Sequence, residues 1–182
     1  MGTMDQDILR VLYTQEEIAA RIKVLGEEMY ADLREKDPLF ISVLRGAFIF
    51  MADIVRSCPV KSDVEFIAVS SYGNAMSSSG AVQITRDIQQ DITGRHLVVI
   101  EDILDSGNTL YYLMDVLRAR KPASIRICAL MDKPDRRTKP ITADYVGFTI
   151  PDAFIVGYGL DYAEKYRNLP YVGVLKPSVY SE

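Results

Sequence analysis

Residues 98–131 follow the pattern of a strand, a turn, a helix and a second strand. Residues 98–102 form an apolar run that ends in two acids, residues 109–120 place apolar side chains at helical spacing, and residues 125–131 are apolar again. Two strands joined by a helix in this way form a βαβ unit, whose strands lie parallel. Because such strands are buried on both faces, we expect an α/β fold with a mainly parallel central sheet flanked by helices.

The remaining sequence continues this alternation of strands and helices. A capping box, Thr14-Gln15-Glu16-Glu17, begins a helix that fades by Pro38. A second helix is expected at 47–58, and further strands are expected at 38–44, 63–70, 81–88, 145–150, 154–160 and 171–175. The length of 182 residues fits one domain, and no linker divides the chain.

The composition argues against several classes of protein. The net charge of −4 does not suit a general nucleic-acid binder. Cys58 and Cys128 lie in apolar segments and His96 is the single histidine, which disfavours a zinc site and indicates a reduced, cytoplasmic protein. The N-terminus lacks the features of a signal peptide, and no apolar run reaches the ~18 residues of a membrane span. We therefore expect neither nucleic acid nor membrane as a partner.

Three acids and a small polar run stand between the strand at 98–102 and the following helix. Glu101, Asp102 and Asp105 precede the segment 106–109 at the expected carboxyl end of a parallel strand, where α/β proteins bind ligands. Amides at a helix N-terminus favour a phosphate, and carboxylates offer oxygen atoms to Mg²⁺ or to sugar hydroxyls. The residues match neither a Walker loop nor a dinucleotide fingerprint. The alternative is a plain turn in which Asp105 or Ser106 caps the helix and the acids are solvated.

The stretch VVIEDILDSGNTL (98–110) resembles the phosphoribosyl pyrophosphate (PRPP) signature of the type I phosphoribosyltransferases. Four further segments resemble the hypoxanthine-guanine phosphoribosyltransferases: SVLRGAFIF (42–50), SSYGNAMSSSG (70–80), LMDKPDRR (130–137) and IPDAFIVGYGLDYAEKYRNLP (150–170). These segments occur in the order of the family and span roughly residues 8–176. The segment 70–80 resembles the mobile catalytic loop of these enzymes.

The resemblance implies purine salvage. The reaction would transfer the 5-phosphoribosyl group from PRPP to hypoxanthine or guanine, giving IMP or GMP and pyrophosphate, with Mg²⁺ as cofactor. It also implies a single phosphoribosyltransferase domain over 1–182, with a core at about 38–150 and a small hood from about 1–15 and 151–182. Since relatives are dimers or tetramers, we expect a homo-oligomer.

The resemblance assigns roles around PRPP. Glu101 and Asp102 would hold the ribose hydroxyls, directly or through Mg²⁺, and Asp105 would be the general base that takes the purine proton. The 5′-phosphate contacts would be Ser106, Gly107, Asn108 and Thr109, and the pyrophosphate contacts would be Arg45, Gly46, Ser71, Tyr72, Arg137 and Arg167. The neighbouring Arg136 could exchange places with Arg137, and the family pattern allows a cis peptide between Leu44 and Arg45.

Four residues would meet the purine. Lys133 would donate to the 6-oxo group, because an ammonium is a donor only. Phe154 would stack on the ring, Ile155 would contact its edge through the backbone, and Asp161 would lie near the 2-position and near a second Mg²⁺, which adds it to Glu101 and Asp102 among the metal-binding residues. The alternatives are a solvated loop lysine at Lys133 and a plain core aromatic at Phe154.

Other functions stay open at this point. A phosphoribosyltransferase-fold regulator that binds RNA would need a basic face and would leave the segment 150–170 unexplained. A phosphoribosyltransferase for adenine, uracil or xanthine is another reading. Lys133 and residues 154–161 favour 6-oxopurines over adenine and uracil, and only weakly over xanthine.

Overall fold

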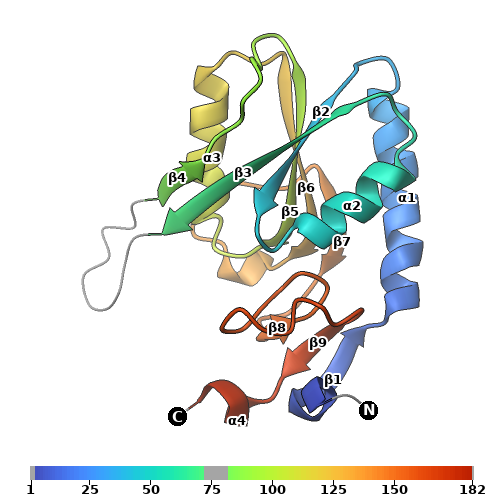
Figure 1. The fold of residues 1–182 in the computed structure, drawn as a ribbon, viewed down its shortest axis with the longest axis vertical. Coiled ribbons are helices and arrows are strands. Elements are labelled where there is room, and N and C mark those ends of the chain that lie inside the picture. Colours follow the sequence, from blue (N-terminus) through green and yellow to red (C-terminus); the bar gives the residue numbers. More distant parts are fainter. Residues whose placement is uncertain (1–2, 72–81, 182) are drawn as a thin grey trace.

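The computed structural model describes residues 3–71 and 82–181, and within these ranges six strands form one large sheet (Figure 1). The strands are β2 (Leu39–Leu44), β3 (Asp63–Ser71), β4 (Val82–Arg86), β5 (His96–Leu104), β6 (Ser124–Asp132) and β7 (Tyr145–Thr149), in the order β4-β3-β2-β5-β6-β7. All neighbouring pairs are parallel except β3 and β4. The expected mainly parallel sheet is confirmed.

Helices cover both faces of this sheet. In Figure 1, α3 (Asn108–Ala119) lies on one side, and α1 (Gln15–Leu33) and α2 (Phe48–Ser57) lie on the other. Along β5, Leu97 and Val99 pack in the core with α3, whereas Val98 and Ile100 pack in the core with α1 and α2. Successive side chains of a strand point to opposite faces, so a strand buried on both faces must be apolar throughout.

The expected capping box begins α1. The amide of Glu17 donates to Thr14 Oγ1 at 3.2 Å, and the amide of Thr14 donates to Glu17 Oε2 at 2.8 Å. These reciprocal bonds satisfy two of the amides that a helix start leaves without intrahelical partners. One face of α1 is then buried, through Ile18, Ile22, Leu25, Met29 and Leu33.

A second, smaller sheet joins the two ends of the chain. It contains β1 (Ile8–Tyr13), β8 (Ile155–Val156) and β9 (Val172–Leu175), antiparallel in the order β1-β9-β8. The short helices η1 (Thr3–Asp7) and α4 (Pro177–Tyr180) flank it, and η2 (Pro134–Arg136) follows β6. In Figure 1 the arrowheads of β2 and β3 point toward the end of the molecule that holds this small sheet. Ligands at the carboxyl ends of the large sheet would therefore face the small one.

Two expectations about strands were wrong. The strand expected at 154–160 ends at Val156, because Gly157, Tyr158 and Gly159 have φ values of 99°, 50° and 101° that a strand cannot contain. The first strand of the βαβ unit, expected to end at Asp102, instead continues to Leu104, because Ile103 and Leu104 still pair with Met131 and Asp132 of β6.

Cys58 and Cys128 are both free thiols and both buried. Over residues 3–71 and 82–181, none of the helices combines the length and the hydropathy that a membrane crossing needs.

Candidate active site

Glu101 and Asp102 are neighbouring acids near the end of β5, where Asp102 is buried and Glu101 is half-buried. The amide of Ile103 donates to Asp102 Oδ1 at 2.8 Å, but Glu101 Oε2 is buried and receives no hydrogen bond from the described residues. Burial raises the pKa of the Glu101 carboxyl well above its usual range, and the charge of Asp102 adds to this shift. Burial also raises the pKa of Asp102. Two neighbouring carboxylates in such surroundings are stabilised by a cation or by hydroxyl donors.

The loop between β2 and α2 closes tightly over Asp102. A Cβ atom on Gly46 would lie only 1.6 Å from Asp102 Oδ2, and a Cβ atom on Gly159 would lie 2.1 Å from the carbonyl oxygen of Gly46. Neither position can hold a larger residue without movement of its neighbours. The peptide between Leu44 and Arg45 is cis, as the family pattern allowed. Two predicted pyrophosphate residues, Arg45 and Gly46, thus adjoin the acids of β5.

The turn from Asp105 to Thr109 leads into α3. Gly107 occupies the N-cap position with φ 84°, and no side chain caps the helix, so the alternative in which Asp105 or Ser106 caps it was wrong. The amide of Asn108 donates to Ser106 Oγ at 3.4 Å. A cavity of about 230 Å³ is lined by Glu101 and residues 103–110. The amides at the start of α3 and the positive end of the helix dipole make this cavity suitable for an anion.

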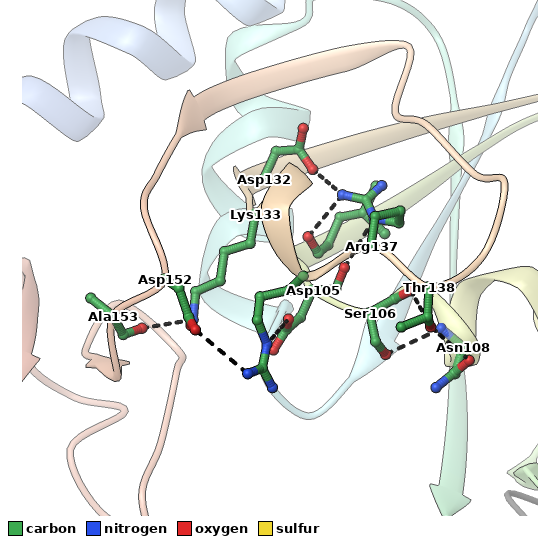
Figure 2. Close-up of polar contacts among 11 residues, drawn as sticks. Asp105, Ser106, Asn108, Asp132, Lys133, Arg137, Thr138, Asp152 and Ala153 are labelled. Atoms are coloured by element: carbon green, nitrogen blue, oxygen red, sulfur yellow. Dashed lines mark hydrogen bonds and ion pairs between the residues drawn. The ribbon is translucent and has the colours of Figure 1, made fainter.

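Arg137 binds the backbone of this turn, beside Asp105 in Figure 2. Its Nε donates to the carbonyl oxygen of Asp105 at 2.9 Å, its Nη2 to that of Leu104 at 3.1 Å, and its Nη1 to that of Ile141 at 2.6 Å. It also pairs with Asp132. This guanidinium is mostly buried and engaged with protein atoms, which gives the predicted pyrophosphate contact at Arg137 no support.

Thr138 contacts the same turn. Its amide donates to the carbonyl oxygen of Ser106 at 3.0 Å, and its hydroxyl contacts that oxygen at 3.1 Å (Figure 2). A Cβ on Gly107 would lie 2.6 Å from a methyl carbon of Ile141. The segment 137–141 therefore packs against the turn and holds its backbone in place.

A second cavity, of about 520 Å³, lies between this turn and the small sheet. Its polar lining comes from Asp105, Lys133, Arg136 and Asp152, and its apolar lining includes Ile103, Phe154, Ile155 and Leu160. A pocket of flat apolar walls with a few polar groups suits a planar heterocycle.

Lys133 is buried in the wall of this cavity. Its ammonium donates to the carbonyl oxygen of Ala153 at 2.6 Å and lies 3.7 Å from Asp152 Oδ1 (Figure 2). The alternative of a solvated loop lysine was wrong. Because an ammonium has three donors, these two partners leave at least one N–H for a ligand.

Asp105 reaches the same cavity with one carboxylate oxygen, Oδ1, that is buried and has no hydrogen bond from the described residues. Arg136 Nε lies 3.4 Å from this oxygen, and Arg136 Nη1 lies 3.5 Å from Asp152 Oδ2. Sequence reasoning missed Asp152 altogether. It could not separate Arg136 from Arg137, because two adjacent arginines carry no mark of which one points into a pocket.

Phe154 is 40% exposed, so the alternative of a plain core aromatic was also wrong. The next residue, Ile155, is buried and pairs with Val174 in the small sheet.

Arg45 and Arg167 are brought together by an acid that the sequence had not singled out. Glu164 Oε2 lies 2.9 Å from Arg45 Nη1 and 3.3 Å from Arg167 Nη2. Arg167 also pairs with Asp161 at 2.9 Å and donates to the carbonyl oxygen of Gly159 at 2.8 Å. One carboxylate bridging two guanidiniums marks a place where a larger anion fits.

Three of the predicted ligand residues are not tested by the geometry. Within 3–71 and 82–181, no three His, Cys, Asp or Glu side chains gather as a metal cage, so the metal role of Asp161, expected near a second Mg²⁺, stays a prediction. Ser71 ends β3, and Tyr72, with the rest of the segment to residue 81, lies outside the described residues.

Comparison with known proteins identifies the family. A model of the phosphoribosyl transferase domain matches residues 11–163. The hypoxanthine-guanine phosphoribosyltransferase of Bacillus subtilis is 52% identical over 177 residues, covering 97% of this chain and 98% of that protein. This chain belongs to the hypoxanthine-guanine phosphoribosyltransferase family.

Other members of the family agree with this placement. The hypoxanthine-guanine phosphoribosyltransferase of Streptococcus pyogenes serotype M3 is 49% identical, covering 98% of this chain and 99% of that protein. A crystal structure of a hypoxanthine phosphoribosyltransferase from Staphylococcus aureus superimposes with a TM-score of 0.96 at 43% identity, covering 100% of this chain and 98% of that one. The expected type I phosphoribosyltransferase fold is confirmed.

Proposed function

We propose that this protein transfers the 5-phosphoribosyl group of PRPP to hypoxanthine or guanine, giving IMP or GMP and pyrophosphate. The relatives at about half identity carry this activity in their names. The observation that carries the proposal is that a buried ammonium, Lys133, and a carboxylate, Asp105, line the same cavity, beside the turn that would bind the phosphate.

The base would lie in the larger cavity. The free N–H of Lys133 suits the 6-oxo group of hypoxanthine or guanine, whereas the 6-amino group of adenine offers no acceptor there. Asp105 Oδ1 lacks a hydrogen bond from the described residues, so it is available to accept the imidazole proton that the purine loses as the glycosidic bond forms. Ile103 and Phe154 supply the apolar walls, Ile155 brings its backbone to the purine edge, and Asp161 lies on the side of the 2-position.

The phosphoribosyl group would lie along the turn at the end of β5. Glu101 and Asp102 accept from the ribose hydroxyls, and Ser106, Gly107, Asn108 and Thr109 donate to the 5′-phosphate. Arg137 and Thr138 do not touch the ligand in this proposal. They hold the carbonyl oxygens of the turn, so that its amides stay directed at the phosphate.

Pyrophosphate would be held by Arg45, Gly46 and Arg167, and by Ser71 and Tyr72 as the family resemblance implies. Arginine suits this group because its planar fork binds phosphate oxygens in pairs. The bridge from Glu164 to both guanidiniums would open when the leaving group binds.

The donor set fits Mg²⁺. Hard carboxylate oxygens are its preferred protein ligands, and Glu101 has a buried oxygen without a hydrogen bond from the described residues. Glu101 and Asp102 would hold the ion together with oxygen atoms of PRPP, and Asp161 would hold a second ion beside the pyrophosphate. When bound, Mg²⁺ neutralises charge on the leaving pyrophosphate.

Two other candidates stay as outcomes of the test. A preference for xanthine would keep every polar contact described here except those at the 2-position. A regulator that binds RNA would leave the lysine and carboxylate of the base cavity without a role.

The proposal is tested by following nucleotide formation by absorbance with PRPP, Mg²⁺ and each of four bases. We expect turnover with hypoxanthine or guanine, little with xanthine or adenine, and none in excess EDTA. Retention on RNA without turnover of any base would overturn the proposal. The predicted hood and the cytoplasmic location stay predictions. The expected dimer or tetramer also stays a prediction, and light scattering coupled to size-exclusion chromatography measures the oligomeric state.

A further inference from the structure

Phe154 belongs to a cluster of three aromatic side chains. Its ring stacks on Tyr180, with centroids 4.7 Å apart and planes 20° from parallel. It meets the edge of Tyr162 at 5.6 Å and 84°. Tyr180 also lines the base cavity, together with Phe154 and Pro177.

Tyr180 is held in place by contacts of its own segment, α4. The amide of Lys176 donates to the carbonyl oxygen of Asp7 at 2.9 Å, which fixes the start of the helix against η1. Val179 and Tyr180 pack against a small core of Val156, Tyr166, Leu169 and Leu175 beneath the small sheet. The Tyr180 ring therefore has a fixed position in the cavity wall, on the side of the small sheet.

The stack decides which face of Phe154 a base can use. Two flat rings 4.7 Å apart leave no space for a third ring between them, since each stacked contact needs about 3.5 Å. Tyr180 covers one face of Phe154 and Tyr162 lies against the ring at 84°, yet 40% of the side chain is exposed. A base must then lie on the face turned away from Tyr180.

We propose that Tyr180 is a positioning residue for the base, acting through Phe154. This inference rests on the proposed function, in which Phe154 stacks on the purine. Tyr180 fixes the plane of the Phe154 ring by packing on the face opposite to the base, so that the base, Phe154 and Tyr180 form a continuous stack. Without this support, Phe154 stands at the start of a strand of two residues and its ring must be ordered when the base binds.

Steady-state kinetics of Tyr180→Ala tests the inference. The KM for hypoxanthine or guanine rises about fivefold, the size of one aromatic pair, while kcat and the KM for PRPP stay within about twofold. Tyr180→Phe behaves as the wild type, because the ring and not the hydroxyl makes the contact. Val179→Ala is the matched control: it trims the same helix and the same small core, and it leaves the KM of the base unchanged.

Three results would overturn the inference. The first is an unchanged KM for the base in Tyr180→Ala. The second is a lower KM for the base in Tyr180→Ala, which would mean that Tyr180 competes with the base. The third is an equal rise in the KM for the base in Val179→Ala, which would mean that the whole C-terminal segment has loosened. Calorimetry with GMP measures the affinity of the same variants for a stacked base, independently of turnover. A wild type that binds GMP but turns over no base would therefore count against the proposed function alone.

Discussion

Gly46 and Asp102 lie in contact across the carboxyl ends of β2 and β5, where a Cβ on the glycine would meet Asp102 Oδ2 at 1.6 Å. Gly46→Ala must therefore displace either the Asp102 carboxylate, proposed to bind the ribose, or the loop proposed to bind pyrophosphate. A shift of about 1 Å in a positioning group can cost ~10²-fold in rate, so we expect kcat/KM for PRPP to fall by about that factor. Circular dichroism and thermal unfolding control for folding. A kcat/KM near that of the wild type would show that the loop is not part of the site.

Asp105→Asn removes the proposed general base and keeps the shape of the turn, because Arg137 and Thr138 bind backbone oxygens there. We expect kcat to fall by ~10²-fold or more, the usual value of a positioned base. Calorimetry with PRPP and Mg²⁺ should show binding close to that of the wild type. Near-normal kcat would remove Asp105 from the mechanism.

Arg136 and Arg137 form a natural matched pair. Arg137→Ala leaves the carbonyl oxygens of Leu104, Asp105 and Ile141 without their donors, and we expect a loss of about 2–4 kcal/mol in unfolding free energy and a higher KM for PRPP. Arg136→Ala breaks only half-exposed ion pairs, so its unfolding free energy should change by less than about 1 kcal/mol. Urea denaturation of both variants measures the difference. Equal losses in the two would contradict the assignment of the buried role to Arg137.

Asp87 gives a prediction for pH. Arg120 Nη2 donates to Asp87 Oδ2 at 2.7 Å, and this hydrogen bond lowers the pKa of the Asp87 carboxyl in the folded protein. The stabilisation is then present above the unfolded pKa of about 3.9 and is lost as pH falls through the lowered folded pKa. Because both side chains are partly exposed, Asp87→Asn should cost only about 0.5 kcal/mol at pH 7. Urea denaturation should show this difference at pH 7 and none below the folded pKa. A difference that persists in acid would assign the effect to packing.

The sequence predicted those parts of the fold whose signals are local. The strand β5, the capping box of α1 and the turn before α3 each carry their pattern within a few residues, and each appears in the structure. The strand β1 was not foreseen, because its partner β9 lies at the other end of the chain. Residues 154–160 look like a strand because they are apolar. The left-handed backbone at Tyr158 is set by the tight approach of Gly157 and Gly159 to Tyr171 and Gly46.

The site shows the same division. The acids of β5 and the residues of the turn follow from one motif, and the structure places Glu101, Asp105 and residues 106–109 around two cavities that share Ile103 and Asp105. The direction of a long side chain follows from tertiary contacts instead. Arg137 points into the protein and Arg136 into the cavity, and Glu164 bridges two arginines from different segments. None of these directions is visible in the spacing of residues.

The discrimination between bases by Lys133 tests the account most directly. Lys133→Met keeps most of the volume of this buried side chain and removes the donor that faces the cavity. A hydrogen bond from a charged group is worth about 1.5–3 kcal/mol, so the preference for hypoxanthine over adenine in kcat/KM should fall by roughly 10- to 100-fold. The measurement is kcat/KM for both bases in the wild type and in the variant, at saturating PRPP and Mg²⁺. An unchanged preference would contradict the assignment of Lys133 to the 6-oxo group.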